Sequence, residues 1–317
     1  MVRLIMMCGL PASGKTTLAK KISRRYNMEI ISSDSIRKEL YGDESVQQDN
    51  SKVFRLVQDR LVNYINKGQS VIMDATNLVS KKRRNFINEI KKRTKILFSS
   101  IIIITSTTLH ECFVNNLNRE RHVSEEVIRK MKKTFQMPCY QEGFSHILIH
   151  YYDKQNKNKN ILQQVVHHDK QYNHDTQWHK FSIGKHEELA GNFIMNKHLN
   201  SNELNIRDKI ILIEATFIHD NGKPFTKTFT NNKGETSINA HYYGHESIGA
   251  LNSLEITTNG DMFTIIDRAI LISYHMLLHH YLRDKTLSLS LMKLQDKVGR
   301  RYSQLLYELY KADCSAH

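Results

Sequence analysis

The amino-acid sequence predicts two domains, an α/β domain with a parallel sheet and an all-α domain after it. In the first half, short apolar runs alternate with amphipathic stretches, which is typical of strands that alternate with helices. A glycine-rich loop separates the first apolar run from the first amphipathic stretch. Beyond a polar stretch near residue 153, long periodicities of apolar residues indicate helices alone. A chain of 317 residues has room for both domains.

The first domain is expected over residues 1–152. Its apolar runs predict strands over 4–7, 29–32, 70–73, 96–104 and 146–151. Its amphipathic stretches predict helices over 16–26, 53–66, 81–91, 109–118 and 125–135. Because strands and helices alternate, the strands are expected to be parallel, with their carboxyl ends at the edge of the sheet where ligands bind.

A polar linker is expected over residues 153–179, which are rich in Lys, Asn, Gln and His and contain at most one short helix, at 161–166. The second domain, which is expected to be all-α, then covers residues 180–317. Its periodicities predict helices over 187–198, 207–218, 262–281 and 287–311.

The formal charge of +14 lies mostly in the first half. Residues 1–153 contain 26 Lys and Arg against 15 Asp and Glu, whereas residues 154–317 contain 20 against 17. This asymmetry suits a polyanion such as nucleic acid or ATP, but a chain rich in Lys, Asn and Ile also admits a plain composition bias. Histidine is distributed the other way, with 13 of 17 after residue 153, which points to metal chemistry in the second half.

The sequence predicts a cytoplasmic protein without membrane contact. The longest apolar run, 96–105, is too short to span a bilayer. The apolar N-terminus runs straight into the glycine-rich loop, as a strand would and a signal peptide would not. The four cysteines form no CxxC pair, which suits thiols in a reducing compartment.

The glycine-rich loop, GLPASGKT at residues 9–16, has the spacing of a Walker A motif. Its glycines let backbone N–H groups turn toward phosphates, and the start of the following helix adds a favourable dipole. We expect Lys15 to reach the β- and γ-phosphates of ATP and Thr16 to supply a hydroxyl to Mg²⁺. The expected ATP-binding residues are Gly9, Ala12, Ser13, Gly14, Lys15, Thr16 and Thr17.

Charged residues follow the second and third predicted strands. Asp34 could accept the proton of an incoming hydroxyl, and Arg37, one helical turn later, could hold a phosphate of the acceptor. The alternative for Asp34 is a helix N-cap. Asp74 ends the third strand, where it would hold Mg²⁺ or its water and border the acceptor beside Arg37; a cap or turn role is the alternative.

Two arginines, Arg119 and Arg121, lie in the break between two predicted helices, where a lid over the phosphates would be. Arginine in a lid can neutralise the charge of the transition state. A solvated basic turn is the alternative.

These groups of residues together resemble the kinase domain of polynucleotide 5′-kinases of the phage type. The resemblance covers about residues 1–152 and rests on GLPASGKTT at 9–17, SSDSIR at 32–37, MDATNLVSKKRR at 73–84 and NRERHVSEEVIRKM at 118–131. It implies that Asp34 activates a 5′-hydroxyl, that Arg37 grips the acceptor phosphate, and that Lys15 and a lid arginine are catalytic. The lid spacing is shorter than usual in that family, so Arg119 and Arg121 are both candidates for the catalytic lid arginine.

The second half contains His219 and Asp220 in the segment HDNGKP, followed by His245 in the segment GHE. Adjacent His and Asp supply a nitrogen and an oxygen ligand, which suits Mn²⁺, Co²⁺, Ni²⁺, Fe²⁺ or Mg²⁺ better than a structural zinc. Such a metal lowers the pKa of bound water and supplies hydroxide for attack on a phosphate.

This pattern resembles the HD-domain phosphohydrolases over about residues 180–317, nearest to HD modules linked to RNA-end and tRNA-tail processing. The resemblance implies that Asp220 is catalytic, that Lys223 holds a substrate phosphate, and that one or two metal ions are bound. The implied metal ligands are His186, His219, Asp220, His245, His275 and Asp313. The alternatives are His174 or His179 for His186, His279 or His280 for His275, and Asp267 for Asp313. Asn221 stands where that family usually has an apolar residue.

The two halves together resemble bifunctional end-healing enzymes, although in those the HD module comes first. The resemblance implies ATP-dependent phosphorylation of 5′-OH ends and metal-dependent removal of 3′-phosphate or 2′,3′-cyclic phosphate ends. RNA is expected as substrate more than DNA, with a separate RNA ligase as a partner; the oligomeric state is left open. One alternative is a small-molecule nucleoside or nucleotide kinase joined to an HD 5′-nucleotidase. Another is a non-catalytic nucleic-acid-binding protein that uses ATP as a switch.

Overall fold

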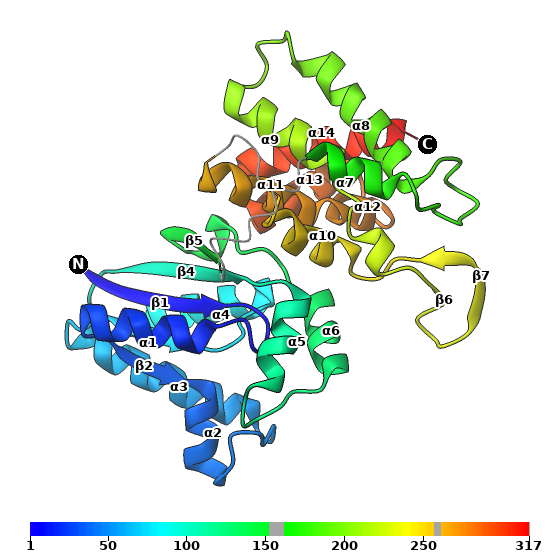
Figure 1. The fold of residues 1–317 in the computed structure, drawn as a ribbon. Coiled ribbons are helices and arrows are strands. Elements are labelled where there is room, and N and C mark those ends of the chain that lie inside the picture. Colours follow the sequence, from blue (N-terminus) through cyan, green and yellow to red (C-terminus); the bar gives the residue numbers. More distant parts are fainter. Residues whose placement is uncertain (152–161, 257–260, 317) are drawn as a thin grey trace. The chain divides into compact units, whose positions relative to one another are not determined.

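The structure is a computed structural model that describes residues 1–151, 162–256 and 261–316. These residues divide into two compact units (Figure 1). The N-terminal unit contains residues 1–131 and 138–151, and the C-terminal unit contains residues 132–137 and 162–316. Among the described residues, no helix combines the length and apolar character needed to cross a lipid bilayer.

The N-terminal unit is built on a parallel sheet whose order is β2-β3-β1-β4-β5. The central residues Leu4, Met6 and Ile72 are fully buried, because helices cover the sheet and the middle parts of its strands are apolar. The strands are β1 (Val2–Cys8), β2 (Glu29–Ser32), β3 (Val71–Asp74), β4 (Phe98–Ser106) and β5 (His146–Tyr151). The prediction of a parallel α/β domain is confirmed.

The helices of this unit are α1 (Lys15–Tyr26), α2 (Ser33–Tyr41), α3 (Asn50–Asn66), α4 (Ser80–Arg93), α5 (Leu109–Leu117), α6 (Glu125–Lys133) and the 3-10 helix η1 (Tyr140–Glu142). Five of them, α1, α3, α4, α5 and α6, begin within three residues of the predicted positions, whereas α2 and η1 were not predicted from amphipathic patterns. Arg83 of α4 forms a buried two-pronged ion pair with Glu142, with both N–O distances at 2.7 Å. This pair fixes the start of α4 beside η1.

The C-terminal unit is mainly helical. Its helices are α7 (Leu162–Asp169), α8 (Ile183–His198), α9 (Ile206–Phe217), α10 (His245–Ser253), α11 (Met262–Tyr274), α12 (Met276–Leu282), α13 (Leu287–Val298), α14 (Arg300–Ser315) and the 3-10 helix η2 (Lys223–Phe225). The segment 132–137 belongs to the same unit: the Met137 N–H donates to Ser273 Oγ at 3.0 Å, and Tyr274 Oη donates to the Met137 carbonyl at 2.9 Å.

Three predictions for this half need correction. The unit is not all-α, because β6 (Thr228–Thr230) and β7 (Thr236–His241) form an antiparallel hairpin that extends from the helices (Figure 1). Residues 162–179 are not a linker, since α7 packs on α8 and a side chain at Gly184 would overlap the α7 backbone. Residues 153–161 of the predicted linker lie outside the described residues. The predicted helix 262–281 is two helices, α11 and α12, which meet at His275. The predicted helix 287–311 is also two helices, α13 and α14, which meet at Gly299, and the φ of Gly299 is +90°.

Candidate functional sites

The glycine-rich loop connects β1 to α1 and has a backbone that few other sequences allow. Ala12 and Gly14 both have positive φ, 60° and 84°. A Cβ at Gly9 would overlap Thr105 Oγ1, so only glycine fits there. Ser13 Oγ lies 2.6 Å from the same Thr105 Oγ1, which ties the loop to β4. The loop is therefore held in shape by the sheet.

Lys15 is buried and folds back over this loop. Its Nζ donates to the Leu10 carbonyl at 2.6 Å and to Ser13 Oγ at 3.4 Å. Burial lowers the pKa of Lys15, while the Asp74 carboxylate opposes that shift. An ammonium group in this position would gain from an anionic ligand in the loop.

Thr16 and Asp74 meet at the carboxyl edge of the sheet. Thr16 Oγ1 donates to Asp74 Oδ2 at 2.7 Å, and Asp74 pairs in register with Ser32 on β2. A hydroxyl and a carboxylate beside a phosphate loop form the oxygen-ligand set that Mg²⁺ uses in P-loop enzymes. This geometry favours the metal role for Asp74 over the acceptor role. Thr17, one residue on, is exposed at the start of α1.

Asp34 is partly exposed at the same edge and contacts two arginines. Arg37 Nη1 lies 2.7 Å from Asp34 Oδ1, and Arg121 Nη1 lies 3.1 Å from Asp34 Oδ2. Arg37 also donates to Asn50 Oδ1 at 2.8 Å. Ser32, rather than Asp34, caps α2 through its hydroxyl. The cap alternative for Asp34 is therefore wrong, and its carboxylate faces the cations.

The two arginines of the predicted lid differ in their contacts. Arg121 Nη1 lies 3.1 Å from Asp34 Oδ2 and 3.4 Å from Glu44 Oε1. Burial is the main cause that lowers the pKa of Lys15, and Arg119 adds only a small contribution to that shift. Of the two, Arg121 is therefore the arginine that the structure brings to Asp34.

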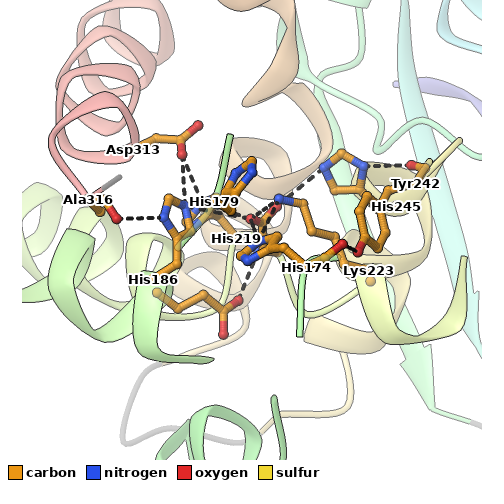
Figure 2. A network of polar contacts seen from close by, with 12 residues as sticks. His174, His179, His186, His219, Lys223, Tyr242, His245, Asp313 and Ala316 are labelled. Carbon is orange, nitrogen blue, oxygen red and sulfur yellow. Dashed lines mark hydrogen bonds and ion pairs between the residues drawn. The ribbon is translucent and has the colours of Figure 1, made fainter. Parts of the chain in front are cut away.

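In the C-terminal unit, the predicted histidines converge on Asp220, and Figure 2 labels His186, His219 and His245 among them. The elements of the predicted histidines and acids are α8 for His186, the turn after α9 for His219 and Asp220, the start of α10 for His245, the end of α11 for His275, and α14 for Asp313. The Nε2 atoms of His186, His219, His245 and His275 lie 3.7, 3.5, 3.3 and 3.7 Å from Asp220 carboxylate oxygens. Asp313 Oδ1 lies 2.9 Å from His186 Nε2 and 3.6 Å from His219 Nε2.

These residues form two groups that share Asp220. One group is His186, His219 and Asp220, and the other is Asp220, His245 and His275; within each, the ligand atoms lie within 4.8 Å of one another. His245 Nε2 and His275 Nε2 are 3.2 Å apart. The arrangement has room for one ion in each group, with Asp220 between them.

The backbone fixes the orientation of every histidine in these groups. The Nδ1 atoms of His186, His219, His245 and His275 lie 3.2, 2.8, 2.8 and 2.7 Å from the carbonyl oxygens of Ala316, Thr216, Tyr242 and Ile272. A carbonyl can only accept, so each Nδ1 carries the proton and each Nε2 lone pair points to the centre. His219 Nε2 is buried and makes no hydrogen bond within the part of the chain that the structure describes. This is how proteins orient metal-binding histidines, so the residues fit a divalent metal.

The alternative ligands lie at different places. Asp267 is bound by Arg207, Arg301 and Tyr302, and thus belongs to an ionic cluster elsewhere in the unit. His279 contacts the second carboxylate oxygen of Asp313, Oδ2, at 2.7 Å. His179 packs on the rings of His174 and His186, and His174 lies near Asp220 itself.

His174 joins the site from the segment predicted to be a linker. It is buried, donates from Nδ1 to the Phe181 carbonyl at 2.9 Å, and has its Nε2 atom 3.9 Å from Asp220 Oδ2. The ring of His179 stacks on that of His174 with centroids 4.0 Å apart (Figure 2).

Lys223 lies inside the site. Its Nζ is 2.6 Å from Asp220 Oδ2 and 3.2 Å from His174 Nε2. Although burial raises the pKa of Asp220, Lys223 and His219 hold that pKa well below its usual range. Burial lowers the pKa of His219, but Asp220 and Asp313 raise it more. The centre thus keeps an ionised carboxylate.

Two buried acids behind the site were not predicted. Glu187 Oε1 accepts a hydrogen bond from the Asp220 N–H at 2.9 Å, and burial raises the pKa of Glu187 well above its usual value. Burial also raises the pKa of Asp169, to about 6, although His168 opposes this. The burial of these acids could not be predicted from the sequence. The spacing of apolar residues along a helix does not show whether an acidic residue at the edge of the apolar face is buried or exposed.

Comparison with known proteins bears on the N-terminal unit. An AAA domain family profile matches residues 4–138. Together with the parallel sheet and the phosphate loop, this match gives the N-terminal unit the fold of a P-loop kinase and supports a kinase reaction there. No curated protein matches the chain.

Three similar solved structures each match less than half of this chain. A chain of the Pnkp1/Rnl/Hen1 RNA repair complex is 16% identical, with a TM-score of 0.36, and the match covers 42% of this chain and 43% of that one. A sugar kinase from a Janibacter species is 16% identical with a TM-score of 0.36, covering 48% and 86%. Kti12 from Chaetomium thermophilum, in complex with ADP-AlF3, is 16% identical with a TM-score of 0.38, covering 48% and 91%.

Proposed function

We propose that the protein is a bifunctional enzyme that heals nucleic-acid ends, RNA in the first place, by phosphorylating 5′-OH ends with ATP and removing phosphate from 3′ ends. The observation that carries this proposal is the pairing, in one chain, of a phosphate-loop site with Asp34 between two arginines and a His/Asp cluster centred on Asp220. The first adds a phosphate and the second removes one. Both reactions are needed at a break that has a 5′-hydroxyl and a 3′-phosphate or 2′,3′-cyclic phosphate.

In the kinase site, Lys15 and the loop N–H groups would bind the phosphates of ATP, and Thr16 and Asp74 would hold Mg²⁺. Asp34 would accept the proton of the attacking hydroxyl. Arg37 and Arg121 beside it suit an acceptor that itself contains phosphates, because guanidinium groups pair with phosphate oxygens in a two-pronged geometry. This favours a polynucleotide end over a nucleoside.

In the C-terminal site, His186, His219, Asp220, His245, His275 and Asp313 would hold one or two divalent metals. A bound metal would supply a water of lowered pKa for attack on a phosphate. Lys223 would exchange its contact with Asp220 for the substrate phosphate. His174, which accepts from the Lys223 ammonium, would keep that ammonium directed into the site.

The test is an incubation of oligonucleotides that have 5′-OH and 3′-phosphate or 2′,3′-cyclic phosphate ends, with ATP and a panel of divalent metals. We expect both ends to be converted, with Lys15→Ala abolishing only the 5′ reaction and Asp220→Ala only the 3′ reaction. Nucleosides and 5′-nucleotides are offered in parallel. Conversion of these small molecules alone would overturn the proposal in favour of a nucleoside kinase joined to a nucleotidase.

A further inference from the structure

Two segments of the C-terminal unit, 170–185 and 223–243, are joined by hydrogen bonds beside the metal-ligand cluster and are here called the aromatic rim. The Ala240 N–H donates to the Asp175 carbonyl at 2.9 Å, and the Gln177 N–H donates to Asn239 Oδ1 at 3.0 Å. Lys227 also donates to the Asn173 carbonyl at 2.8 Å. These contacts join the 173–177 loop to β7 and the start of the hairpin, so the side chains of the rim are presented on a defined scaffold.

The rim concentrates the exposed aromatic side chains of its unit. Eight aromatic residues are exposed in the described part of the C-terminal unit, and six of them lie in the rim. They are Tyr172, Trp178, Phe181, Phe225, Phe229 and Tyr243. Trp178, the only tryptophan of the chain, is 62% exposed. Tyr172 and Phe225 pack against the ring of His168, and Tyr243 stacks on His241, so these three also have packing roles. Single exposed aromatic residues are ordinary, but a group of six in two joined segments is not.

The rim also concentrates positive charge. Residues 162–316 contain 17 Lys and Arg and 17 Asp and Glu, whereas the rim contains six lysines and two acids. Lys170 and Lys185 share the single carboxylate of Glu188, and Lys180 and Lys233 are exposed on the outer part of the rim. The remainder of residues 162–316 contains 11 Lys and Arg against 15 Asp and Glu, so the positive charge of this part of the chain lies mainly in the rim, where it would attract a polyanion.

The rim continues into the metal-ligand cluster. His174, which faces Asp220, and His179, which stacks on it, come from the same loop as Trp178. Lys223, which belongs to the second rim segment, contacts both Asp220 and His174, so the rim and the metal-ligand cluster share residues at this point.

We propose that the aromatic rim binds single-stranded nucleic acid next to the end that the metal site processes, with bases stacking on Trp178 and neighbouring rings and phosphates contacting the lysines. This rests on the proposed function and adds to it that the substrate is a polymer whose unpaired bases are recognised. Proteins that bind single-stranded nucleic acid without sequence preference use aromatic side chains to stack on the bases and positively charged side chains to contact the phosphates. A rim built for a protein partner would have less reason to be basic.

The direct test uses the fluorescence of Trp178 in the full-length Asp220→Ala protein, which leaves the oligonucleotide intact. We expect a single-stranded RNA 10-mer to quench the emission to saturation, with an apparent Kd that rises steeply with salt. A duplex and a mononucleoside phosphate should quench much less. Equal quenching by the mononucleoside phosphate, or none by the 10-mer, would overturn the proposal.

Variants give a second readout, anisotropy of a labelled 10-mer. Trp178→Ala should raise the Kd about 5- to 150-fold, the range that corresponds to about 1–3 kcal/mol of base stacking, and Trp178→Phe should restore most of the affinity. The matched control is Phe263→Ala, an exposed aromatic about 18 Å along α11 from His275. Equal loss in the control would overturn the proposal, as would self-association that shields Trp178 in sedimentation experiments.

The two proposals fail in different ways. Hydrolysis of p-nitrophenyl phosphate, which has no bases, reports on the metal site alone and should be unchanged in Trp178→Ala, while the KM for a 10-mer with a terminal 3′-phosphate rises. If the protein hydrolyses neither p-nitrophenyl phosphate nor the 3′-phosphate of the 10-mer, but the 10-mer still quenches Trp178, the proposed phosphatase activity is wrong and the rim proposal stands. If the protein hydrolyses both substrates and the KM for the 10-mer is the same in Trp178→Ala, the rim proposal is wrong and the phosphatase proposal stands.

Discussion

Thr16 and Asp74, 58 positions apart in the sequence, are joined by a hydrogen bond of 2.7 Å at the carboxyl edge of the parallel sheet. The bond gives Asp74 a place beside the phosphate loop, where it would act on Mg²⁺. We expect Asp74→Asn to slow the phosphorylation of hydroxyl ends about 100- to 1000-fold at saturating substrate, the usual loss for one preorganised electrostatic contact. Kinase assays over a range of Mg²⁺ concentrations measure this effect. Hydrolysis of 3′-phosphate by the same variant is the control, and an unchanged rate of phosphorylation would contradict the assignment.

The two lid arginines should give different kinetic defects. Arg121 is paired with Asp34 and Glu44, which leaves Arg119 as the candidate for neutralising charge on the transferred phosphate, so Arg119→Ala should mainly lower kcat, about 100-fold or more. Arg121 contacts Asp34, so Arg121→Ala should mainly raise the KM for the acceptor, about tenfold for a loss of about 1.4 kcal/mol. Initial-rate kinetics with ATP and acceptor varied separately distinguish the two effects. The reverse pattern would exchange the roles of the two arginines.

Local sequence patterns were sufficient for the N-terminal unit. Each strand there is an apolar run followed by a turn, and parallel pairing brings the strand ends together, so Asp34 and Asp74 could be placed at one edge from the sequence. What could not be predicted is that Arg121 contacts Asp34, because this contact depends on how the loop after α5 folds back. The functional assignment of these residues stays a prediction.

The C-terminal unit was harder to predict, for reasons that specific residues show. The β6–β7 hairpin is polar and exposed on most of its length, with Ile238 97% exposed, so no alternation of buried residues marks it. His174 lies in a polar stretch that resembles a linker, and only the packing of α7 on α8 and the hydrogen bonds to β7 bring it to Asp220. By contrast, the histidines spaced along the helices were found by motif alone.

Because Asp220 is shared by both ligand groups, its replacement should affect the whole metal centre. We expect Asp220→Ala to remove all bound divalent metal, and His275→Ala to reduce the metal content of the group formed with His245 while sparing the group of His186 and His219. Elemental analysis of purified protein after dialysis measures both. His280→Ala, on α12 outside both groups, is the matched control. Full retention of metal by Asp220→Ala would show that the centre is elsewhere.

The buried acid Asp169 should destabilise the metal-free protein at neutral and alkaline pH. Burial raises the pKa of Asp169 from 3.8 to about 6, so its favourable contribution is present below pH 3.8 and is lost as the pH rises through about 6. Asp169→Asn, which removes the ionisation, should raise the unfolding free energy at pH 8 by about 1–3 kcal/mol. At pH 5 the gain should be smaller. Urea denaturation with EDTA at both pH values measures the difference, and an equal effect at the two pH values would exclude ionisation as the cause.

The turn that holds Asp220 depends on a close approach of two backbones at Gly222. A Cβ there would overlap the His245 carbonyl oxygen and the Gly249 nitrogen, which are backbone atoms that cannot move without displacing α10. We therefore expect Gly222→Ala to destabilise the protein by about 2–4 kcal/mol and to weaken metal binding, because His219, Asp220 and His245 shift together. Gly234→Ala is the control: its φ is +85° but no atom lies near, so it should cost only about 1–2 kcal/mol and leave the metal content unchanged. Equal metal content in both variants would show that the approach at Gly222 supports the fold without shaping the site.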